Sequence, residues 1–542
     1  MQIKKWKLFL IIVVCVLSAS LAAIIFHIMN ARMSAYPYDT ALDYSYDFNR
    51  TDAQIVNLYL KNQKFTLPVL NGYPSKHKPA YSNTHNPPDS NTHNTRHETL
   101  PSIYSAFLKI NVNTTFMGKF FQPEVKLSTN KLFISEYFET GSQGTRYINI
   151  SSLISPDTGG VNATESKKPG IDIESKKYDI AVSSKQNGVE AGSKEETGSQ
   201  KDGIEIVLNG KRISFKDQQI QLILFKNKDI ATSKILIIAP HPDDAEIAAF
   251  GIYSSNKNSY IVTVTAGDAG TYQYDELYSN RKNHFLKKGK IRTWNSIAVP
   301  LLSGIPPEQV LNLGFFDGTL KTMFKSNPSS VKALYTGITN IDIFREQNIS
   351  SLVNLLEGGS NWNGLVKNLE LLIKKIEPDI IVAPYPALDK HPDHKFSSIA
   401  LFEAIKKTGT RSGSLYLYTN HFVLNEYYPY GKAGGVISPP PFFSRDIIYF
   451  NSLYSHHLSA DRQKDKILSL EAMNDLRPDT TWRFSEDSIK MAVASIRRDI
   501  MGQNVSYYRR AVRDNELFFV VDINDIYDRY ILNQITGQDF MP

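Results

Sequence analysis

The segment Lys234-Ile-Leu-Ile-Ile-Ala-Pro-His-Pro-Asp-Asp244 joins an uninterrupted apolar run to a polar cluster. The apolar part, 234–239, has the length and composition of a strand buried on both faces, as in a parallel sheet. The cluster 241–244 follows at once, and an apolar helical pattern begins at Asp244. A strand that ends in a polar cluster at the start of a helix predicts an α/β domain with its ligand site at that point.

Short apolar runs alternate with helical patterns on the C-terminal side of this segment. The alternation predicts a Rossmann-like, mostly parallel sheet with helices on both faces, over residues 233–542. The candidate strands are 234–239, 260–265, 309–313 and 379–383. The candidate helices are 244–253, 276–302, 364–376, 394–406, 461–475 and 486–499.

A different pattern precedes the α/β domain. Short runs rich in β-branched and aromatic residues predict a smaller β-rich, sandwich-like domain over residues 101–228. A stretch rich in Ser, Lys, Glu and Gly, at about 156–203, is expected to be a mobile insertion within it. Before this domain, two copies of Ser-Asn-Thr-His-Asn, at 82–86 and 90–94, fall in a stretch too polar to form a core. We expect residues 35–100 to be a polar linker.

The first part of the chain has the pattern of a membrane anchor. Three lysines within the first seven residues precede an uncharged, mainly apolar run from Leu8 to Met29. As a helix this run is about 33 Å long, enough to cross a bilayer, and the lysines favour a cytoplasmic N-terminus. Residues 1–34 are therefore expected to be a cytoplasmic stub and transmembrane signal-anchor. A signal peptide cleaved at Ser18-Ala19-Ser20 is the alternative.

This topology predicts a single-pass membrane protein with an extracytoplasmic catalytic domain, periplasmic or at the cell surface in a bacterium. Composition narrows the partners further. The net charge of +7 is small for 542 residues, and no basic block is suited to a phosphate backbone, so we expect no nucleic-acid partner. The only cysteine, Cys15, excludes an internal disulfide and a Cys-based zinc site. The sequence does not indicate an oligomeric state.

A second cluster, His391-Pro392-Asp393-His394, resembles the first in form and position. It follows the candidate strand 379–383 and begins a helix. Each cluster alone has an ordinary explanation, because Asp caps helices and Pro suits the first helical turn. Two such clusters, at the carboxyl ends of strands in one sheet, indicate a shared site.

The residue types in the two clusters suit a catalytic metal. Zinc sites that catalyse hydrolysis use three nitrogen or oxygen ligands and keep one position open. His241, Asp244 and His394 offer such a set for one Zn²⁺ per chain. Asp243 leaves the backbone in a different direction and is placed to take a proton from water.

Two further residues of the second cluster lie at the rim of the same site. His391, three residues before His394, is placed either to stabilise an oxyanion or to protonate a leaving amine. Asp393 is either the partner of an imidazole or a favourable charge at a helix N-terminus.

As a set, these motifs resemble the PIG-L, or LmbE-like, family of zinc-dependent N-acetylglucosaminyl deacetylases over roughly residues 234–404. The matching stretches are His241-Pro-Asp-Asp244 with Glu246, Thr265-Ala-Gly-Asp-Ala-Gly270, Arg292, Leu313-Gly-Phe-Phe-Asp-Gly318, Pro378-Asp379 and His391-Pro-Asp-His394. The resemblance implies zinc ligands at His241, Asp244 and His394, a general base at Asp243, an acid or oxyanion partner at His391, and substrate contacts at Arg292 and Asp317.

The chain departs from the family pattern at two positions. Ala245 stands where Glu is commonest, and Asn295 stands where the helix after the second strand often has Glu. The second departure concerns the local substrate contacts. Residues 1–232 have no matching counterpart in the family.

We therefore expect a zinc-dependent hydrolase that removes the N-acetyl group from an N-acetylated amino sugar in a glycan or glycolipid and releases acetate. The alternatives are an anchored carbohydrate-binding protein without turnover and a zinc amidase that acts on a different amide. Two segments would shape specificity. The polar insertion Lys321–Asn363 is either a lid or a disordered loop. The aromatic segment Phe422–Phe443 is either a sugar-binding face or a surface crossing.

Overall fold

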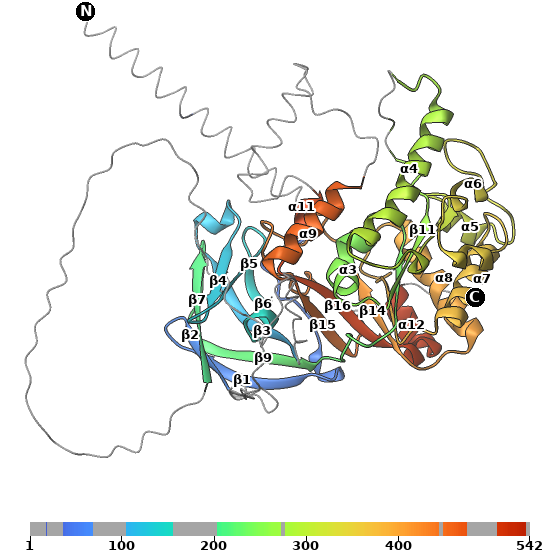
Figure 1. The fold of residues 1–542 in the computed structure, drawn as a ribbon. Coiled ribbons are helices and arrows are strands. Elements are labelled where there is room, and N and C mark those ends of the chain that lie inside the picture. The colour runs from blue at the N-terminus through green and yellow to red at the C-terminus, as the bar shows by residue number, and fades with distance from the viewer. Residues whose placement is uncertain are drawn as a thin grey trace, which may run out of the picture.

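The computed structural model describes part of the chain and defines the arrangement of its sheets (Figure 1). The described residues are 18, 36–68, 104–154, 203–270, 272, 277–443, 448–473 and 507–537. They form one seven-stranded sheet and two smaller sheets.

The seven-stranded sheet carries the two polar clusters. Its strand order is β12-β11-β10-β13-β14-β16-β15, in which the first five strands are parallel and the last two pair antiparallel. The strands are β10 (Ile235–Ala239), β11 (Ser259–Thr265), β12 (Val310–Phe315), β13 (Ile380–Pro384), β14 (Ser414–Tyr418), β15 (Ser452–His457) and β16 (Asn515–Asp522).

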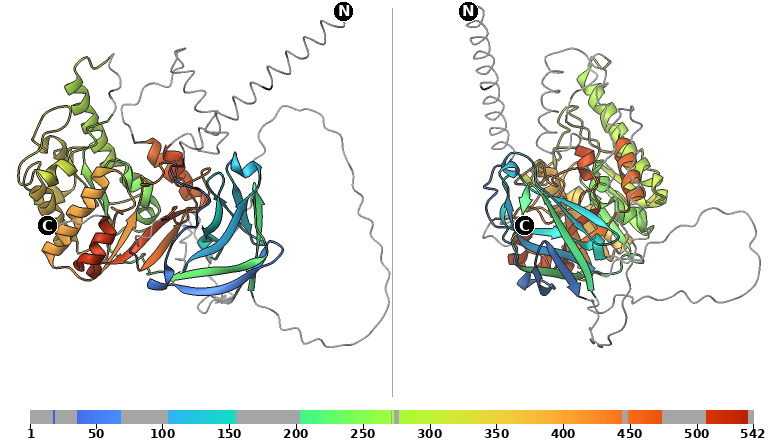
Figure 2. Two further views of the ribbon diagram at one scale, coloured as in Figure 1. Left: turned by 180° about the vertical axis from the view of Figure 1, so that it is seen from behind. Right: turned by 90° about the vertical axis from the view of Figure 1, so that its left-hand side faces the viewer.

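Helices cover both faces of this sheet (Figures 1 and 2). Side chains alternate between the faces of a strand. Leu236 and Ile238 of β10 pack in the core that contains α7 and α8, whereas Ile235 and Ile237 pack in the core that contains α3 and part of α4. The helices are α3 (Asp244–Ser255), α4 (Arg281–Leu302), α5 (Leu320–Lys325), α6 (Asp342–Arg345), α7 (Trp362–Ile376), α8 (Pro392–Thr408), α9 (Ala460–Glu471), α11 (Tyr507–Ala511) and α12 (Arg529–Thr536).

The two smaller sheets face each other across an apolar core. One contains β1 (Gln54–Leu60), β9 (Gln218–Lys226), β3 (Tyr104–Thr114), β6 (Gln143–Asn149) and β8 (Ile213–Ser214). The other contains β2 (Lys64–Pro68), β7 (Gly203–Lys211), β4 (Glu124–Ser128) and β5 (Phe133–Tyr137), and a short helix, α2 (Ser151–Ile154), follows β6. Strand β15 of the large sheet contacts β3 and β9, so the smaller sheets lie against its antiparallel edge (Figure 2).

The predicted fold class is wrong for the chain as a whole. Both smaller sheets are entirely antiparallel, and β15 and β16 add antiparallel pairings to the large sheet, so antiparallel pairings outnumber parallel ones among the described residues. The alternation of strands and helices predicted a parallel arrangement that holds only from β10 to β14. The chain then returns to the sheet edge from the opposite direction, which the alternation does not encode.

The predicted membrane topology is also corrected. Within the described part of the chain, no helix is both long and apolar enough to span a bilayer. The apolar run 8–29, on which the prediction of a single-pass protein with an extracytoplasmic catalytic domain depended, lies outside the described residues except for Ser18.

Part of the predicted polar linker is folded. Residues 54–68 form β1 and β2, and the aromatic side chains of Tyr36, Tyr44, Tyr46 and Phe48 are buried in the core of the large sheet. The linker prediction was wrong for this part because these apolar side chains are spaced between polar residues. The insertion at 156–203 lies outside the described residues except for Gly203, which begins β7. The division of the chain into domains stays a prediction.

A buried ion pair fastens the start of the described chain to β6. The side chains of Arg146 and Glu139 have no exposed surface, and Arg146 Nε lies 3.7 Å from Glu139 Oε2. The guanidinium also donates to the carbonyl of Thr40 at 2.6 Å and to that of Leu42 at 2.9 Å. It lies 4.2 Å from the ring centroid of Tyr44. Arg146 therefore anchors the segment 40–44.

Arg146→Ala should lower the free energy of unfolding by about 3–5 kcal/mol, because it leaves the Glu139 carboxylate buried without its cation. Urea denaturation measures the change. Arg50→Ala is the matched control, since Arg50 pairs with Asp47 at the surface, where its side chain is 65% exposed, and should cost less than about 1 kcal/mol. Equal stability of the two variants would contradict the role of Arg146.

Glu136 of β5 is buried where the smaller sheets meet the segment before β15. Its carboxyl group bonds the backbone N–H of Tyr137 at 2.9 Å and the hydroxyl of Ser438. Burial raises the pKa of Glu136 from 4.5 to about 8, although both hydrogen bonds oppose the shift. The folded protein therefore holds a proton here that the unfolded chain releases.

The stability that this proton contributes should be fully present below pH 4.5 and should be lost as the pH rises through about 8. Glu136→Gln should remove this part of the pH dependence, because the amide does not ionise. Urea denaturation across that pH range measures it, with Glu205→Gln on exposed β7 surface as the control. A Glu136→Gln variant that loses as much stability with rising pH as the control would contradict the assignment.

Candidate metal centre

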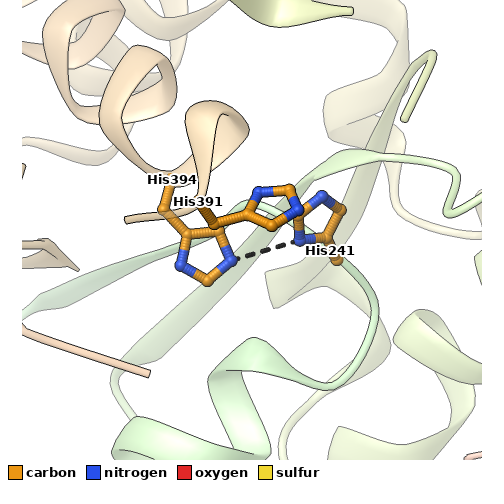
Figure 3. Close-up of side chains that lie close together, drawn as sticks. All are labelled: His241, His391 and His394. Carbon is orange, nitrogen blue, oxygen red and sulfur yellow. Dashed lines mark hydrogen bonds between the residues drawn. The ribbon is translucent and has the colours of Figure 1, made fainter. Parts of the chain in front are cut away.

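Two loops at the carboxyl edge of the large sheet carry the cluster residues. His241 follows β10, and Asp244 is the first residue of α3. His391 caps α8 and His394 lies in its first turn, beyond β13. Because β10 and β13 are neighbouring parallel strands, their carboxyl ends are adjacent. Figure 3 shows the resulting group of three imidazoles.

Three donor atoms form a nearly equilateral triangle. His241 Nδ1 lies 3.2 Å from His394 Nε2, the contact dashed in Figure 3. Asp244 Oδ2 lies 3.2 Å from His241 Nδ1 and 3.1 Å from His394 Nε2. Tetrahedral zinc with ligands at about 2.0–2.1 Å separates neighbouring donors by about 3.3 Å. The spacing of this donor triangle therefore fits a four-coordinate metal.

Wider groups of donors surround the triangle. His241 with His391 and His394 forms one, and His241 with Asp317 and Asp393 forms another, with the ligand atoms of each group within 4.8 Å of one another. His241 Nε2 is buried without a hydrogen bond, 3.2 Å from Asp317 Oδ1. The donor triangle is the set that contains Asp244, and its three donor separations are each 3.1–3.2 Å.

Two neighbouring side chains aim the donor atoms. His394 Nδ1 lies 2.9 Å from Asp389 Oδ2, so its proton is held there and the Nε2 lone pair faces the triangle. Asn420 Nδ2 donates to Asp244 Oδ1 at 2.7 Å, and Oδ2, which also accepts the backbone N–H of His241 at 2.9 Å, faces the triangle. Asp389 also accepts the backbone N–H groups of His391 and Asn420, at 2.9 Å and 3.2 Å. It therefore joins the loops that follow β13 and β14.

The triangle lies in a surplus of negative charge. Burial lowers the pKa of His394, but the carboxylates of Asp244 and Asp389 outweigh burial and raise it to about 10. Burial raises the pKa of Asp244, yet His394 and His241 hold it well below its usual range. The carboxylates that stabilise the charged imidazole also stabilise a metal cation, which takes the place of the protons.

Asp243, the predicted base, occupies a strained position directly before α3. Its φ of 112° lies in the left-handed region that non-glycine residues rarely adopt. Its Oδ2 atom accepts hydrogen bonds from Tyr508 Oη at 2.9 Å and Arg292 Nη2 at 3.3 Å. Burial raises the pKa of Asp243, and the Arg292 cation opposes that rise. The carboxylate next to the triangle therefore holds a proton more tightly than an exposed aspartate does.

His391 lies against the two ligand histidines. Its ring centroid is 4.7 Å from that of His241 and 5.0 Å from that of His394. Burial, together with the positive charge of His241 and His394, lowers the pKa of His391 to about 4. The imidazole is therefore neutral near pH 7. Its Nδ1 accepts the backbone N–H of Asp393 at 3.3 Å, which places its remaining proton on Nε2.

The two predicted substrate contacts have different partners in the site. Arg292 Nη2 bonds Asp243 and the carbonyl of Pro242, and a Cβ atom at Gly267 would lie 2.5 Å from Arg292 Nε. Arg292 is therefore held against the predicted base by the close approach of a glycine. Asp317 lies beside His241 Nε2, and although burial raises its pKa, His241 lowers it further, so it is ionised.

Asp393 connects the second cluster to the loop after β12. Its carboxylate accepts the N–H of Gly318 at 2.6 Å and that of Leu320 at 3.2 Å, and Oδ2 lies 3.4 Å from His241 Nε2. These contacts place the carboxylate near an imidazole and fasten the loop that carries Asp317. The side chain bonds a neighbouring loop, which distinguishes it from a simple helix-terminal charge.

Three residues of the site were not predicted. Asp389, five residues before His394, had a usable signal, because ligand histidines regularly donate their second N–H to a carboxylate. Asn420 lies in the loop after β14, where neighbouring strand ends meet, but no pattern distinguishes it from other polar loop residues. Tyr508 lies 265 residues from its partner Asp243 and carries no local signal.

The aromatic segment Phe422–Phe443 does not present all its rings to solvent. Tyr428 and Tyr430 are each only 8% exposed and pack in the core. Tyr428 donates to the carbonyl of Ser438 at 2.7 Å, and Tyr430 bonds Tyr38 at 2.6 Å through their hydroxyls. For these two tyrosines, packing between the smaller sheets and the large sheet replaces the hypothesis of a sugar-binding face.

Metal-dependent hydrolases hold an ion between three nitrogen or oxygen donors, with a further carboxylate beside it to take a proton. The fold and the site place this chain in that class. Residues 236–405 match the family model described as PIG-L: GlcNAc-PI de-N-acetylase. The match confirms the resemblance seen in the motifs and the predicted enzyme class, a metal-dependent N-deacetylase. No curated protein sequence matches the chain.

The chain is also similar to solved structures of low sequence identity. The A40926 pseudoaglycone deacetylase Dbv21 is 14% identical, with 54% of this chain and 98% of that chain covered and a TM-score of 0.27. The zinc-inhibited form of the teicoplanin deacetylase Orf2 is 14% identical, with 53% and 98% covered and a TM-score of 0.28. The 4-carboxy-2-hydroxymuconate hydratase GalB from Pseudomonas putida KT2440 is 12% identical, with 53% and 96% covered and a TM-score of 0.28.

Asp389→Asn should weaken metal binding by about 10- to 100-fold, because the amide no longer provides a charged acceptor for the N–H of His394. Competition with a chromogenic chelator measures the affinity. Asp379→Asn is the matched control, since Asp379 is exposed and its carboxylate accepts the backbone N–H of Lys234, away from the triangle. Equal metal affinity in both variants would show that Asp389 does not orient the ligand.

Proposed function

We propose that this chain is a zinc-dependent hydrolase that removes the N-acetyl group from an N-acetylated amino sugar in a glycan or glycolipid. The observation that carries the proposal is the donor triangle of His241, Asp244 and His394, with sides of 3.1–3.2 Å. The match of residues 236–405 to a de-N-acetylase family supports the reaction class. The donor set, two imidazoles and one carboxylate, supports zinc.

Zinc, when bound, supplies Lewis acidity toward the amide carbonyl and the attacking water. Asp243 takes one proton from the water molecule while the oxygen of that water bonds to the carbonyl carbon. The two contacts on Oδ2, from Tyr508 and Arg292, hold the carboxylate in place and leave Oδ1 for that proton.

His391 acts on the carbonyl oxygen of the substrate. As a neutral imidazole with its proton on Nε2, it donates a hydrogen bond where negative charge develops during the attack. The neutral state of His391 favours the role of stabilising the oxyanion over that of a general acid that protonates the leaving amine. The carbon–nitrogen bond then breaks, the proton held by Asp243 passes to the nitrogen, and acetate and the free amino sugar leave.

The surroundings of Asp243 suit both halves of this cycle. A base must accept a proton from water and later release it to an amine, which requires a proton affinity above that of an exposed carboxylate. Burial raises the pKa of Asp243 in this direction. Arg292 keeps the carboxylate ionised at the start, so we assign Arg292 to positioning the base as well as to the predicted contact with the sugar. Asp317, ionised beside His241, is the other predicted contact with the sugar, and we assign it as the acceptor of a sugar hydroxyl.

Acetate release from N-acetylhexosamine glycans and glycolipids tests this function. Asp243→Asn should retain bound metal and lose about 10²- to 10⁴-fold in kcat, because the amide does not accept the proton. Asp244→Asn should lose the metal itself, since the amide is a poor ligand in place of an anionic donor. Turnover and metal content are measured on the same preparations.

Asp342→Asn serves as the control, because Asp342 is a surface residue of α6 with a 72% exposed side chain. Acetate release that does not depend on metal would contradict the proposal. A metal-loaded protein that binds N-acetylated glycans and leaves all of them intact would favour carbohydrate binding without turnover. Release of a different acid from a non-sugar amide would move the chain to another amidase specificity.

A further inference from the structure

The insertion after Asp317 brings an apolar side chain to the rim of the site. Leu334 packs over Gly318, since a Cβ atom at Gly318 would lie 2.8 Å from Leu334 Cδ1. The preceding residue, Asp317, contacts His241 at 3.2 Å. Leu334 therefore borders the metal centre, although it follows Gly318 by sixteen positions in the sequence.

The next residue of the insertion builds an aromatic surface on α4. Tyr335 stacks on Phe285 with ring centroids 4.0 Å apart and an angle of 13° between the planes. The guanidinium of Arg281 lies 4.7 Å from the Tyr335 ring and 5.6 Å from the Phe285 ring. A guanidinium on the far face of Tyr335 would be much more distant from Phe285, so Arg281 lies beside the stacked pair.

Helix α4 connects this surface to the predicted base. Phe285 and Arg292 are seven residues apart, so they share one face of the helix and are separated by about 10 Å along its axis. Arg292 bonds Asp243. Leu334 is thus linked to the metal centre through the loop that carries Asp317, and Phe285 through the helix that carries Arg292. We call Leu334, Tyr335, Phe285 and Arg281 the rim wall.

The rim wall combines a rigid support with exposed apolar area. Phe285 is fully buried, whereas Tyr335 is 36% exposed and Leu334 is 58% exposed. The stacking on Phe285 already restricts the tyrosine ring, so the binding of a ligand on this ring costs little further side-chain entropy. Exposed apolar side chains next to a catalytic site, with a cation beside them, are typical of a surface that binds part of a ligand.

We propose that the rim wall binds a second sugar ring, joined to the N-acetylated sugar that occupies the metal centre. The assignment depends on the proposed function and adds a substrate class, a glycan of at least two rings. The C–H face of a pyranose packs on the exposed ring and on Leu334, and the Arg281 guanidinium donates to its hydroxyls. An alkyl chain would gain from the apolar part but would leave the guanidinium without an acceptor.

Deacetylation of three probes tests the rim wall: N-acetylglucosamine, its disaccharide with an unsubstituted hexose, and its octyl glycoside. The wild type should prefer the disaccharide to the monosaccharide. Tyr335→Ala should raise KM for the disaccharide about tenfold, the usual scale of one aromatic contact, with kcat and the monosaccharide unchanged. Tyr335→Phe should keep the preference, and Leu334→Ala should reduce it less than Tyr335→Ala does.

Tyr59→Ala is the matched control, because Tyr59 is 60% exposed on β1 of the smaller sheets. The same ligands are titrated calorimetrically into the Asp243→Asn variant, with and without Tyr335→Ala, so that their binding to the rim wall is measured without turnover. If no probe is deacetylated, the proposed function fails, while a Tyr335-dependent preference for binding the disaccharide still supports the rim wall. A disaccharide preference that Tyr335→Ala and Leu334→Ala leave unchanged, or that the wild type lacks, overturns it. A Tyr335 effect confined to the octyl glycoside overturns the sugar assignment.

Discussion

The hydrogen-bonded pairing of β10 with β13 is the constraint on which the metal centre depends. The two strands are distant in the sequence, but as parallel neighbours they end at the same edge of the sheet. His241 leaves the first strand and His394 enters the helix after the second, so the pairing brings their donor atoms to 3.2 Å. A shift in this register would separate the donors and remove the triangle, whatever the remainder of the sheet did.

The parts that support the triangle come from elsewhere in the chain. Asn420 follows β14 and orients Asp244, and Asp389 lies between β13 and α8 and orients His394. Tyr508 of α11 reaches Asp243 just before the chain enters β16. The antiparallel edge of the sheet therefore contributes to the site and also contacts the smaller sheets. The insertion after β12 adds Leu334 and Tyr335, which form the rim wall together with Arg281 and Phe285 of α4.

The sequence predicted the strands and helices near the clusters well, because each buried strand is a continuous apolar run that ends in the residues of interest. His241, Asp244 and His394 could be grouped for the same reason, since the ends of parallel strands meet. Tyr508 and Asn420 could not, because their roles depend on long-range packing. The antiparallel return of β15 and β16 and the folding of residues 36–68 were missed likewise, as both depend on partners far along the chain. The membrane span was inferred from the length of the apolar run and the lysines before it, and no helix in the described part of the chain could span a bilayer.

The identity of the metal ligands is the central claim, and X-ray absorption spectroscopy of the zinc-loaded protein, combined with anomalous diffraction from its crystals, tests it most directly. We expect one zinc per chain, with His241 Nδ1, Asp244 Oδ2 and His394 Nε2 at about 2.0–2.2 Å. Zinc bound instead between His241, Asp317 and Asp393, or between His391 and its neighbouring histidines without Asp244, would contradict this ligand assignment. It would also leave the position of Asp243 beside the triangle without a catalytic explanation.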